Sequence, residues 1–361
     1  MARSCALSIA VTAVTVALLC FVHVSGSYAT CMCANATLCE PLKSPPVSPR
    51  ELFVFTQSPT GYQHYNWTYI TTIAAFFPLE TYPALLCEAH ARGVRVVTKA
   101  GYFPVANLSS AADRDAWVSA QVARATAVGA DGVNVDIEEP VAGVTAAGQL
   151  TAMVGALHDA MRARNPHAQV TFDVAWGPDD VDGRAYDYAG LAAATDALFV
   201  MGYDERSQVW GDGPCVAGAN AGLGQTESGW KGYAQLGISA THLLAGMPWY
   251  GRVYPCLSLV NNVCTVREVP FRGCNCSDAV SSERGYSDIH PPAGALQWDA
   301  ASASPFFNVG DTQQVWYDNP QSLVLKYAAA RANGMRGVGM WTGDFSTSQA
   351  MWAAFDAFFA P

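Results

Sequence analysis

The chain repeats one unit, a short apolar or alternating run followed by a helical stretch, and this repetition limits the possible folds more than any other feature. Eight of the runs have the length and residue types of buried strands. They lie at residues 52–57, 71–77, 94–100, 131–138, 169–176, 197–204, 243–250 and 337–342. Apolar residues at helical spacing fill several connections, at 82–93, 142–164 and 321–334. Eight strands that alternate with helices predict an α/β fold, the (β/α)8 or TIM barrel.

This alternation is interrupted once, between the seventh and the eighth predicted strand. Residues 252–315 are too many for a simple loop. They carry four cysteines, which are Cys256, Cys264, Cys274 and Cys276. We therefore expect a disulfide-bearing insertion over the catalytic end of the barrel. With it, residues 29–361 form one domain, and a hydrophobic content of 51% is enough for a large core.

The first residues are typical of a secretory signal peptide. A basic start at Arg3 leads into an apolar run from Cys5 to about Val24, and small residues follow. We predict a signal peptide over residues 1–28, with an uncleaved anchor as the alternative because the apolar run is long. No later segment has 18 uninterrupted apolar residues, so no membrane span is expected after cleavage. The expected location is the lysosome or the outside of the cell.

The cysteines agree with export. Two of the eleven lie in the predicted signal peptide, and the other nine cluster near the N-terminus and at 256–276, apart from Cys87 and Cys215. We expect loop-stapling disulfides, with one thiol left over because nine is odd. A zinc site is the alternative. The C-x-C spacings at 31–33 and 274–276, with no histidine pair nearby, argue against it, and we expect no metal ion.

Sequons for N-linked glycosylation occur at Asn35, Asn66 and Asn107, and a fourth at Asn275 is weakened by its middle cysteine. In an exported chain such sequons predict surface loops that carry glycans. Chance occurrence is the alternative at each single site.

The stretch DGVNVDIEEP, residues 131–140, carries the chemistry. Val133, Val135 and Ile137 alternate with three polar residues, which is strand periodicity. In a barrel the apolar set faces the helices, so Asn134, Asp136 and Glu138 face inward and climb to the rim where active sites lie. The alternative is a polar cluster satisfied by neighbouring strands.

The spacing of the two carboxyl groups indicates a mechanism. Asp136 and Glu138 have Cα atoms roughly 6.6 Å apart, so at least one of them should keep a proton to higher pH. A protonated carboxyl in a pocket is a general acid for a glycosidic oxygen. Because both groups come from one face of one strand, they cannot readily straddle a sugar ring. A substrate with a 2-acetamido group can supply its own nucleophile, and the geometry is compatible with that.

The motif resembles the D-G-x-D-x-D-x-E signature of glycoside hydrolase family 18, with Asn134 where most members have Asp. Further matches follow in family order. MGYD at 201–204 resembles the sixth-strand motif, GMPWYG at 246–251 the seventh and GMW at 339–341 the eighth. The resemblance covers roughly residues 31 to 345.

The resemblance implies roles residue by residue. Glu138 would protonate the leaving oxygen and then activate water. Asp136 would orient the acetamido N–H and balance the charge of an oxazolinium intermediate. Tyr203 would hydrogen-bond the acetamido carbonyl, and Trp341 would form the floor of the sugar pocket. Asn134, also expected at the substrate site, cannot share a proton with Asp136, so the relay of charge along this strand is in doubt.

Other residues have two readings. Asp204 either caps the following helix or holds Tyr203 in place near the substrate. Trp176 and Trp249 either line the same cleft or pack in the core. Tyr203 and Trp341 also have core packing as the alternative.

The expected function is a glycosidase that hydrolyses β-1,4-linked N-acetylglucosamine by substrate-assisted, retaining catalysis. Its expected substrate is the di-N-acetylchitobiose core of N-linked oligosaccharides, split from the reducing end, and no cofactor is expected. An endochitinase is the first alternative. A non-catalytic chitin-binding lectin is the second, although Glu138, Asp136 and Tyr203 are all present. A net charge of −10 without Lys/Arg runs excludes nucleic acid as a partner, and a monomer is expected.

Overall fold

The computed structural model describes residues 33–360 except 45, 47, 210 and 212. The predicted signal peptide, residues 1–28, lies outside the described residues. Among the helices of the described part, none is long and apolar enough to cross a membrane.

Eight parallel strands close into a barrel, which confirms the predicted fold. In ring order they are β1 (Glu51–Thr56), β2 (Thr72–Ala75), β3 (Arg95–Lys99), β4 (Gly132–Val135), β5 (Gln169–Val174), β6 (Ala197–Met201), β7 (Leu243–Pro248) and β15 (Gly337–Trp341). Each lies within a stretch predicted as a strand, give or take one residue. The ring closes where β15 pairs with β1, in the register Glu51 to Gly337.

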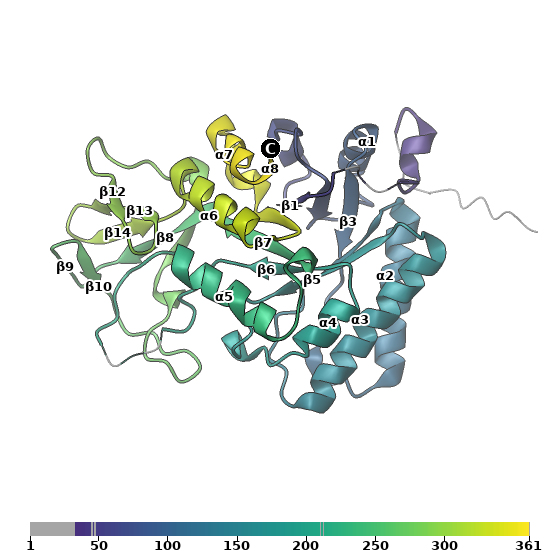
Figure 1. The fold of residues 1–361 in the computed structure, drawn as a ribbon, viewed down its shortest axis with the longest axis horizontal. Helices are drawn as coiled ribbons and strands as arrows, with labels where there is room; N and C mark the ends of the chain where they lie inside the picture. Colours follow the sequence, from purple (N-terminus) through teal and green to yellow (C-terminus); the bar gives the residue numbers. More distant parts are fainter. Residues whose placement is uncertain (1–32, 45, 47, 210, 212, 361) are drawn as a thin grey trace, which may run out of the picture.

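Helices surround the barrel (Figure 1). They are α1 (Ala84–Ala91), α2 (Ala111–Val128), α3 (Val144–Arg164), α4 (Tyr188–Ala193), α5 (Leu223–Gln235), α6 (Pro320–Ala332), α7 (Gln349–Ala353) and α8 (Asp356–Phe359). Local sequence sets their ends. The Ser110 side chain accepts from Asp113 N at the start of α2, and Gly129 ends that helix with φ 71°. Asn319 and Ser322 form a capping box at the start of α6, with proline at its first position.

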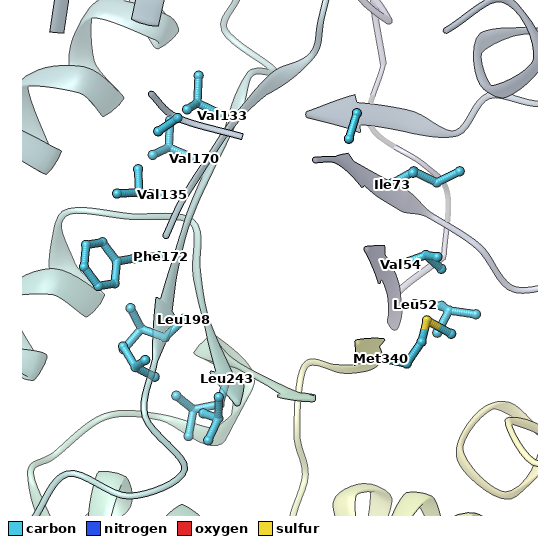
Figure 2. Packing of buried hydrophobic residues seen from close by; sticks show 14 of the residues in the cluster. Leu52, Val54, Ile73, Val133, Val135, Val170, Phe172, Leu198, Leu243 and Met340 are labelled. Carbon is cyan, nitrogen blue, oxygen red and sulfur yellow. The ribbon is translucent and has the colours of Figure 1, made fainter. Parts of the chain in front are cut away.

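Alternating residues of each strand separate two cores. One set faces the helices and forms the large outer core, where Val133, Val135, Val170, Phe172 and Leu198 pack (Figure 2). The other set fills the barrel, where Phe53, Phe55 and Phe199 are its largest buried members. The polar residues of β4 therefore point into the barrel, as the alternation predicts.

Two glycines make room for the ring of Phe199 inside the barrel. A Cβ at Gly246 would lie 2.4 Å from Phe199 Cε1, and one at Gly339 would lie 2.6 Å from Phe199 Cε2. Both glycines stand in the motifs of the seventh and eighth strands. They keep the aromatic plug beneath the cavity close-packed.

The expected insertion lies between β7 and β15 and is mainly β-structure. Its five-stranded sheet runs in the order β11 (Ser282–Gly285), β8 (Tyr250–Pro255), β14 (Gln313–Trp316), β13 (Ser304–Val309) and β12 (Gln297–Asp299). A separate hairpin is formed by β9 (Ser258–Val260) and β10 (Val263–Thr265). Figure 1 shows this unit projecting from one side of the barrel.

Disulfides staple the loops, as the cysteine pattern predicts. Cys256 pairs with Cys264 across the β9–β10 hairpin, and Cys215 pairs with Cys276, which ties the β6–α5 connection to the insertion. Cys33 pairs with Cys87 of α1, and Cys39 is also disulfide-bonded. Among the described cysteines, Cys274 is a free, buried thiol. No group of three or more potential metal ligands gathers in the described part of the chain.

Candidate active site

The two carboxyl groups lie at the rim, directly after β4. The strand ends at Val135, so Asp136 and Glu138 follow it instead of lying within a strand that runs to 138. The ammonium group of Lys99, at the end of β3, lies 2.9 Å from Asp136 Oδ2. Lys99 Nζ also lies 4.4 Å from the ring centroid of Phe76. The arrangement places the cation of Lys99 against the Asp136 side chain.

Glu138 is held in a different way. Arg184, from the β5–α4 connection, donates from Nη2 to Glu138 Oε2 at 2.6 Å and from Nε to the Glu138 carbonyl oxygen at 3.2 Å. Burial raises the pKa of Glu138 to about 7, and the charge of Asp136 adds to the rise, while Arg184 and Lys99 oppose it. This carboxyl therefore carries a proton in mildly acidic solution, as a general acid must.

Both carboxyl groups line one cavity of about 180 Å³ at the carboxyl end of the barrel. Three barrel strands and their extensions contribute its polar lining, with the two carboxyl groups after β4, Asp173 from β5 and Tyr203 just after β6. Trp341, the last residue of β15, supplies an aromatic wall. The insertion adds Tyr250 from β8 and Glu283 from β11. The predicted site residues Asp136, Glu138, Tyr203 and Trp341 are thus brought together.

Aromatic packing fixes the orientation of Trp341. Its ring centroid lies 5.5 Å from that of Phe55 and 5.3 Å from that of Phe76. The peptide bond from Trp341 to Thr342 is cis. Trp341 keeps partial exposure toward the cavity, where an indole face fits the C–H face of a pyranose.

Tyr203 is turned to the cavity by the alternation of β6. Met201, two residues earlier, lies in the inner core, and Leu198 and Val200 face the helices. Burial raises the pKa of the Tyr203 hydroxyl well above its usual value, and the nearby carboxyl of Asp173 adds to the rise. The hydroxyl therefore stays protonated and can donate a hydrogen bond to a ligand in the cavity.

Asn134 does not lie at the substrate surface, which corrects its expected role. It is completely buried below the cavity. Its Nδ2 donates to Asp173 Oδ1 at 2.8 Å and to Thr171 Oγ1 at 3.0 Å, both on β5. Asn134 supports a carboxyl that does line the cavity.

Asp204 holds neighbouring cavity residues, and the next helix that the structure describes, α5, has Gly222 at its N-cap instead. Its Oδ1 accepts from Tyr250 Oη at 2.7 Å and from Arg252 Nε at 3.0 Å. The ring of Tyr250 packs edge-on to that of Tyr203, with centroids 6.0 Å apart. Asp204 thus supports Tyr203 through Tyr250, and it also lines the cavity.

The two other predicted tryptophans, Trp249 and Trp176, lie in different surroundings. Trp249 is completely buried against the C-terminal helices, where its Nε1 donates to Tyr327 Oη at 3.3 Å and its ring packs against Trp352. It therefore cannot contact a substrate, and its cleft assignment is wrong. Trp176 lines a second, smaller hollow that shares Glu138, Tyr203 and Asp204 with the main cavity.

Sequence reasoning missed several cavity residues. Alternation could have found Asp173, because Val170, Phe172 and Val174 face the helices and leave Gln169, Thr171 and Asp173 inside. The same rule applied to the seventh strand points to Tyr250 and away from Trp249. Arg184 lies in the β5–α4 connection and Glu283 in a short strand of the insertion, β11, and neither position has a periodic pattern that marks it.

The sequon asparagines Asn35 and Asn107 are exposed and Asn66 is partly so. Their accessibility fits glycan attachment, which stays a prediction.

Comparisons with known proteins show the family of the chain. Residues 97–345 match the model of the glycosyl hydrolases family 18. The chain is 40% identical over 344 residues to di-N-acetylchitobiase of Mus musculus, covering 90% of this chain and 92% of that protein. It is 39% identical to the di-N-acetylchitobiase of Homo sapiens, covering 87% of this chain and 82% of that one.

Among solved structures, the family 18 chitinase of Cycas revoluta in complex with (GlcNAc)3 matches with a TM-score of 0.70 at 19% identity. The match covers 85% of this chain and 99% of that chain, and it supports the fold. The family model and the relatives of about 40% identity over most of the chain go further. The chain therefore belongs to glycoside hydrolase family 18.

Proposed function

We propose that the protein hydrolyses the β-1,4 bond after an N-acetylglucosamine residue, and that it splits the di-N-acetylchitobiose core of N-linked oligosaccharides from the reducing end. One observation carries the proposal. A carboxyl with a pKa raised to about 7, Glu138, shares a cavity with the Lys99-paired carboxylate of Asp136 and with the Tyr203 hydroxyl. This is an acid beside a negative charge and a hydrogen-bond donor, all facing one sugar-sized space.

In the proposed reaction the substrate supplies the nucleophile. Glu138 gives its proton to the bridging oxygen while the acetamido carbonyl oxygen attacks the anomeric carbon. The C–O bond breaks and a cyclic oxazolinium forms. Asp136 accepts a hydrogen bond from the acetamido N–H and balances the positive charge. The Glu138 carboxylate then takes a proton from water, whose oxygen opens the ring with retention of configuration.

The tyrosine would position the nucleophile. Tyr203 donates its hydroxyl hydrogen to the acetamido carbonyl oxygen and keeps that oxygen under the anomeric carbon. Trp341 would support the same sugar ring from below. Among the other carboxyl groups of the cavity, Glu283 is the candidate for direct attack. Burial raises the pKa of Glu283, so a smaller fraction of its side chain is the carboxylate that direct attack requires.

The substrate class rests on relatives. The mouse and human proteins that share about 40% of the sequence are called di-N-acetylchitobiases. The disulfides of the structure fit an exported or lysosomal protein. Because the pKa of Glu138 is raised, its carboxyl is protonated at the pH of an acidic compartment, which fits activity there. An endochitinase on the same scaffold is the second candidate, favoured by the chitinase likeness of the fold.

Product analysis tests the proposal. The protein is incubated at pH about 5 with chitobiose, chitohexaose and an N-glycan released from asparagine. We expect one reducing-end N-acetylglucosamine from the glycan and from chitobiose. Mainly dimers and trimers from chitohexaose, with chitobiose intact, would establish the endochitinase. Binding without cleavage would establish the lectin. A substrate whose acetamido group is replaced by an amine should not be cleaved, and its turnover would refute substrate assistance.

A further inference from the structure

We propose that Arg184 ends the cleft immediately beyond Glu138, so that the leaving side holds a single sugar, and that the same guanidinium sets which oxygen of Glu138 carries the catalytic proton. This inference rests on the proposed function. It gives the reducing-end preference a physical origin in the β5–α4 connection.

The position of the departing sugar follows from the two hollows, because Glu138 lines both of them. The general acid must lie between the ring that is attacked and the sugar that departs. The main cavity holds Asp136, Tyr203 and Trp341, which would handle the attacked ring. Glu138 also faces the second hollow, of about 60 Å³, which Trp176, Asp182 and Arg184 line. The second hollow is therefore where the departing sugar lies.

The far side of this hollow is a built wall. Val141 N donates to Gly183 O at 3.1 Å, and Tyr186 Oη donates to the carbonyl oxygens of Ile137 and Glu139, so the connections after β4 and β5 are joined. The insertion backs this wall, because a Cβ at Gly183 would lie 2.0 Å from Arg272 Nη2.

The β6–α5 connection reinforces the same wall, since Asp182 N donates to Gln208 Oε1 at 2.6 Å. The Arg184 side chain is only 10% exposed. A longer reducing-end chain would have to displace this packed arrangement of three connections and the insertion.

Two residues that line the hollow each carry a polar atom without a hydrogen-bond partner in the described part of the chain. Trp176 Nε1 and Asp182 Oδ1 are both buried, and neither has a hydrogen-bond partner within the described part of the chain. Buried polar groups without partners are costly. One is a donor and the other an acceptor. Sugar hydroxyls satisfy both kinds of group, so a single saccharide unit fits the chemistry of this hollow.

Arg184 also fixes the geometry of the acid. Its Nη2 donates to Glu138 Oε2 at 2.6 Å, and an oxygen that accepts from a guanidinium is not the one that holds a proton. The proton of Glu138 therefore lies on Oε1. Arg184 is a positioning residue for the acid as well as the end of the cleft.

Other charged groups also face Glu138, and they determine how the pKa of Glu138 changes when Arg184 is removed. Asp136 follows the same strand, Lys99 comes from β3 and Asp173 from β5. Asp182 lies beside Arg184, with its Oδ2 3.4 Å from Arg184 Nη2. Asp204 lines both hollows. Because Arg184 lowers the pKa of Glu138, its loss removes one of the two cations, Arg184 and Lys99, that oppose the rise. The pKa of Glu138 then rises.

The test compares Arg184→Ala and Arg184→Lys with the unaltered protein on chitotetraose labelled at its reducing end. For the unaltered protein we expect labelled monosaccharide. For Arg184→Ala we expect the ratio of labelled disaccharide to monosaccharide to rise about tenfold, as one blocking contact is lost. The alkaline limb of its kcat/KM profile should move up by about one pH unit. Arg184→Lys should keep the alkaline limb of the kcat/KM profile where it is in the unaltered protein. It should still release more labelled disaccharide than the unaltered protein.

Controls separate the inference from the proposed function. Arg164→Gln, at the exposed end of α3, should match the unaltered protein in products and pH profile, and circular dichroism should show all variants folded. If the unaltered protein releases monosaccharide and Arg184→Ala changes neither the product ratio nor the pH profile, the inference is overturned alone. If the unaltered protein releases mainly disaccharide or nothing, the proposed function has failed first.

Discussion

Asn134 Nδ2 lies 2.8 Å from Asp173 Oδ1, beneath the carboxyl pair of the cavity. Burial raises the pKa of Asp173 well above its usual value, and the charge of Asp136 adds to the rise, while the hydrogen bond from Asn134 opposes it. Asn134 stands where the signature that this stretch resembles has an aspartate, so this position carries an amide and no carboxyl. A carboxyl on the neighbouring strand lies next to it instead.

This pairing predicts the outcome of restoring the usual family residue. Asn134→Asp should destabilise the protein at pH 7 by about 1–3 kcal/mol, because it adds a second buried acid beside Asp173 and removes that acid's donor. The double variant Asn134→Asp with Asp173→Asn should recover most of the loss. Urea unfolding at pH 7 measures both, and a double variant no more stable than the single one would contradict the pairing.

Glu138→Gln should abolish turnover and leave the melting temperature nearly unchanged. An amide cannot transfer the proton, yet its oxygen can still accept from Arg184, and the side chain is 47% exposed. Glu139→Gln is the matched control. Glu139 instead accepts from Tyr102 Oη at 2.5 Å and Val105 N at 3.1 Å, so its variant should retain turnover. Activity in Glu138→Gln on chitobiose would remove the acid assignment.

Tyr203→Phe should lower kcat by about 10- to 1000-fold, the scale of losing one donor to developing charge. The ring contacts with Tyr250 remain, so the fold should be unaffected. Steady-state kinetics on a chromogenic chitobioside would measure the loss, with thermal melting as the control for folding. An unaltered kcat would return Tyr203 to a packing role.

The pH dependence of activity follows from Glu138. The acid must be protonated, and burial raises its pKa to about 7. We expect kcat/KM to be constant just below this value and to fall about tenfold per pH unit well above it. A profile that keeps rising to pH 9 would show that another group is the acid.

Stability should depend on pH through Glu205, which is buried between β6 and α5. Its carboxyl accepts from Gly222 N at 2.8 Å, and burial raises its pKa from 4.5 to about 8. The folded state holds a proton that the unfolded state releases. The stability gained from that proton is complete below pH 4.5 and is lost progressively as pH rises toward 8.

Between these limits the loss is at most about 1.4 kcal/mol per pH unit from this group. Glu205→Gln should flatten this part of the curve, because an amide carries no charge to bury. The exposed Glu268→Gln serves as the control. Equal slopes in denaturation free energy for all three proteins would rule out Glu205 as the source.

Much of the fold could be predicted because barrel strands carry a simple signal. Short apolar or alternating runs predict all eight strands, and the alternation after residue 131 predicts that Asp136 and Glu138 face the cavity. Alternation along β7 also places Trp249 on the face that packs against the helices, as the structure has it. The sequence motifs marked Tyr203 and Trp341 because those residues lie at strand ends.

The rest of the site depends on contacts between distant connections. Arg184 reaches Glu138 from a connection without regular structure, and Glu283 enters the cavity from a strand inserted after β7. Neither position has a periodic neighbourhood, and their side-chain directions are set by tertiary packing. The buried position of Asn134 could not be predicted for a related reason, because its depth below the rim depends on where β4 ends.

Closure of the ring by β15 also bears on how the protein is made. The strand that pairs with both β1 and β7 is the last of the barrel to be synthesised, and it ends in Trp341 of the cavity. Until the ribosome has added it, β1 and β7 expose unpaired edges that other chains can join. A nascent chain therefore needs protection from aggregation until β15 has been translated, and a product truncated before Trp341 has neither a closed barrel nor the indole face of the cavity.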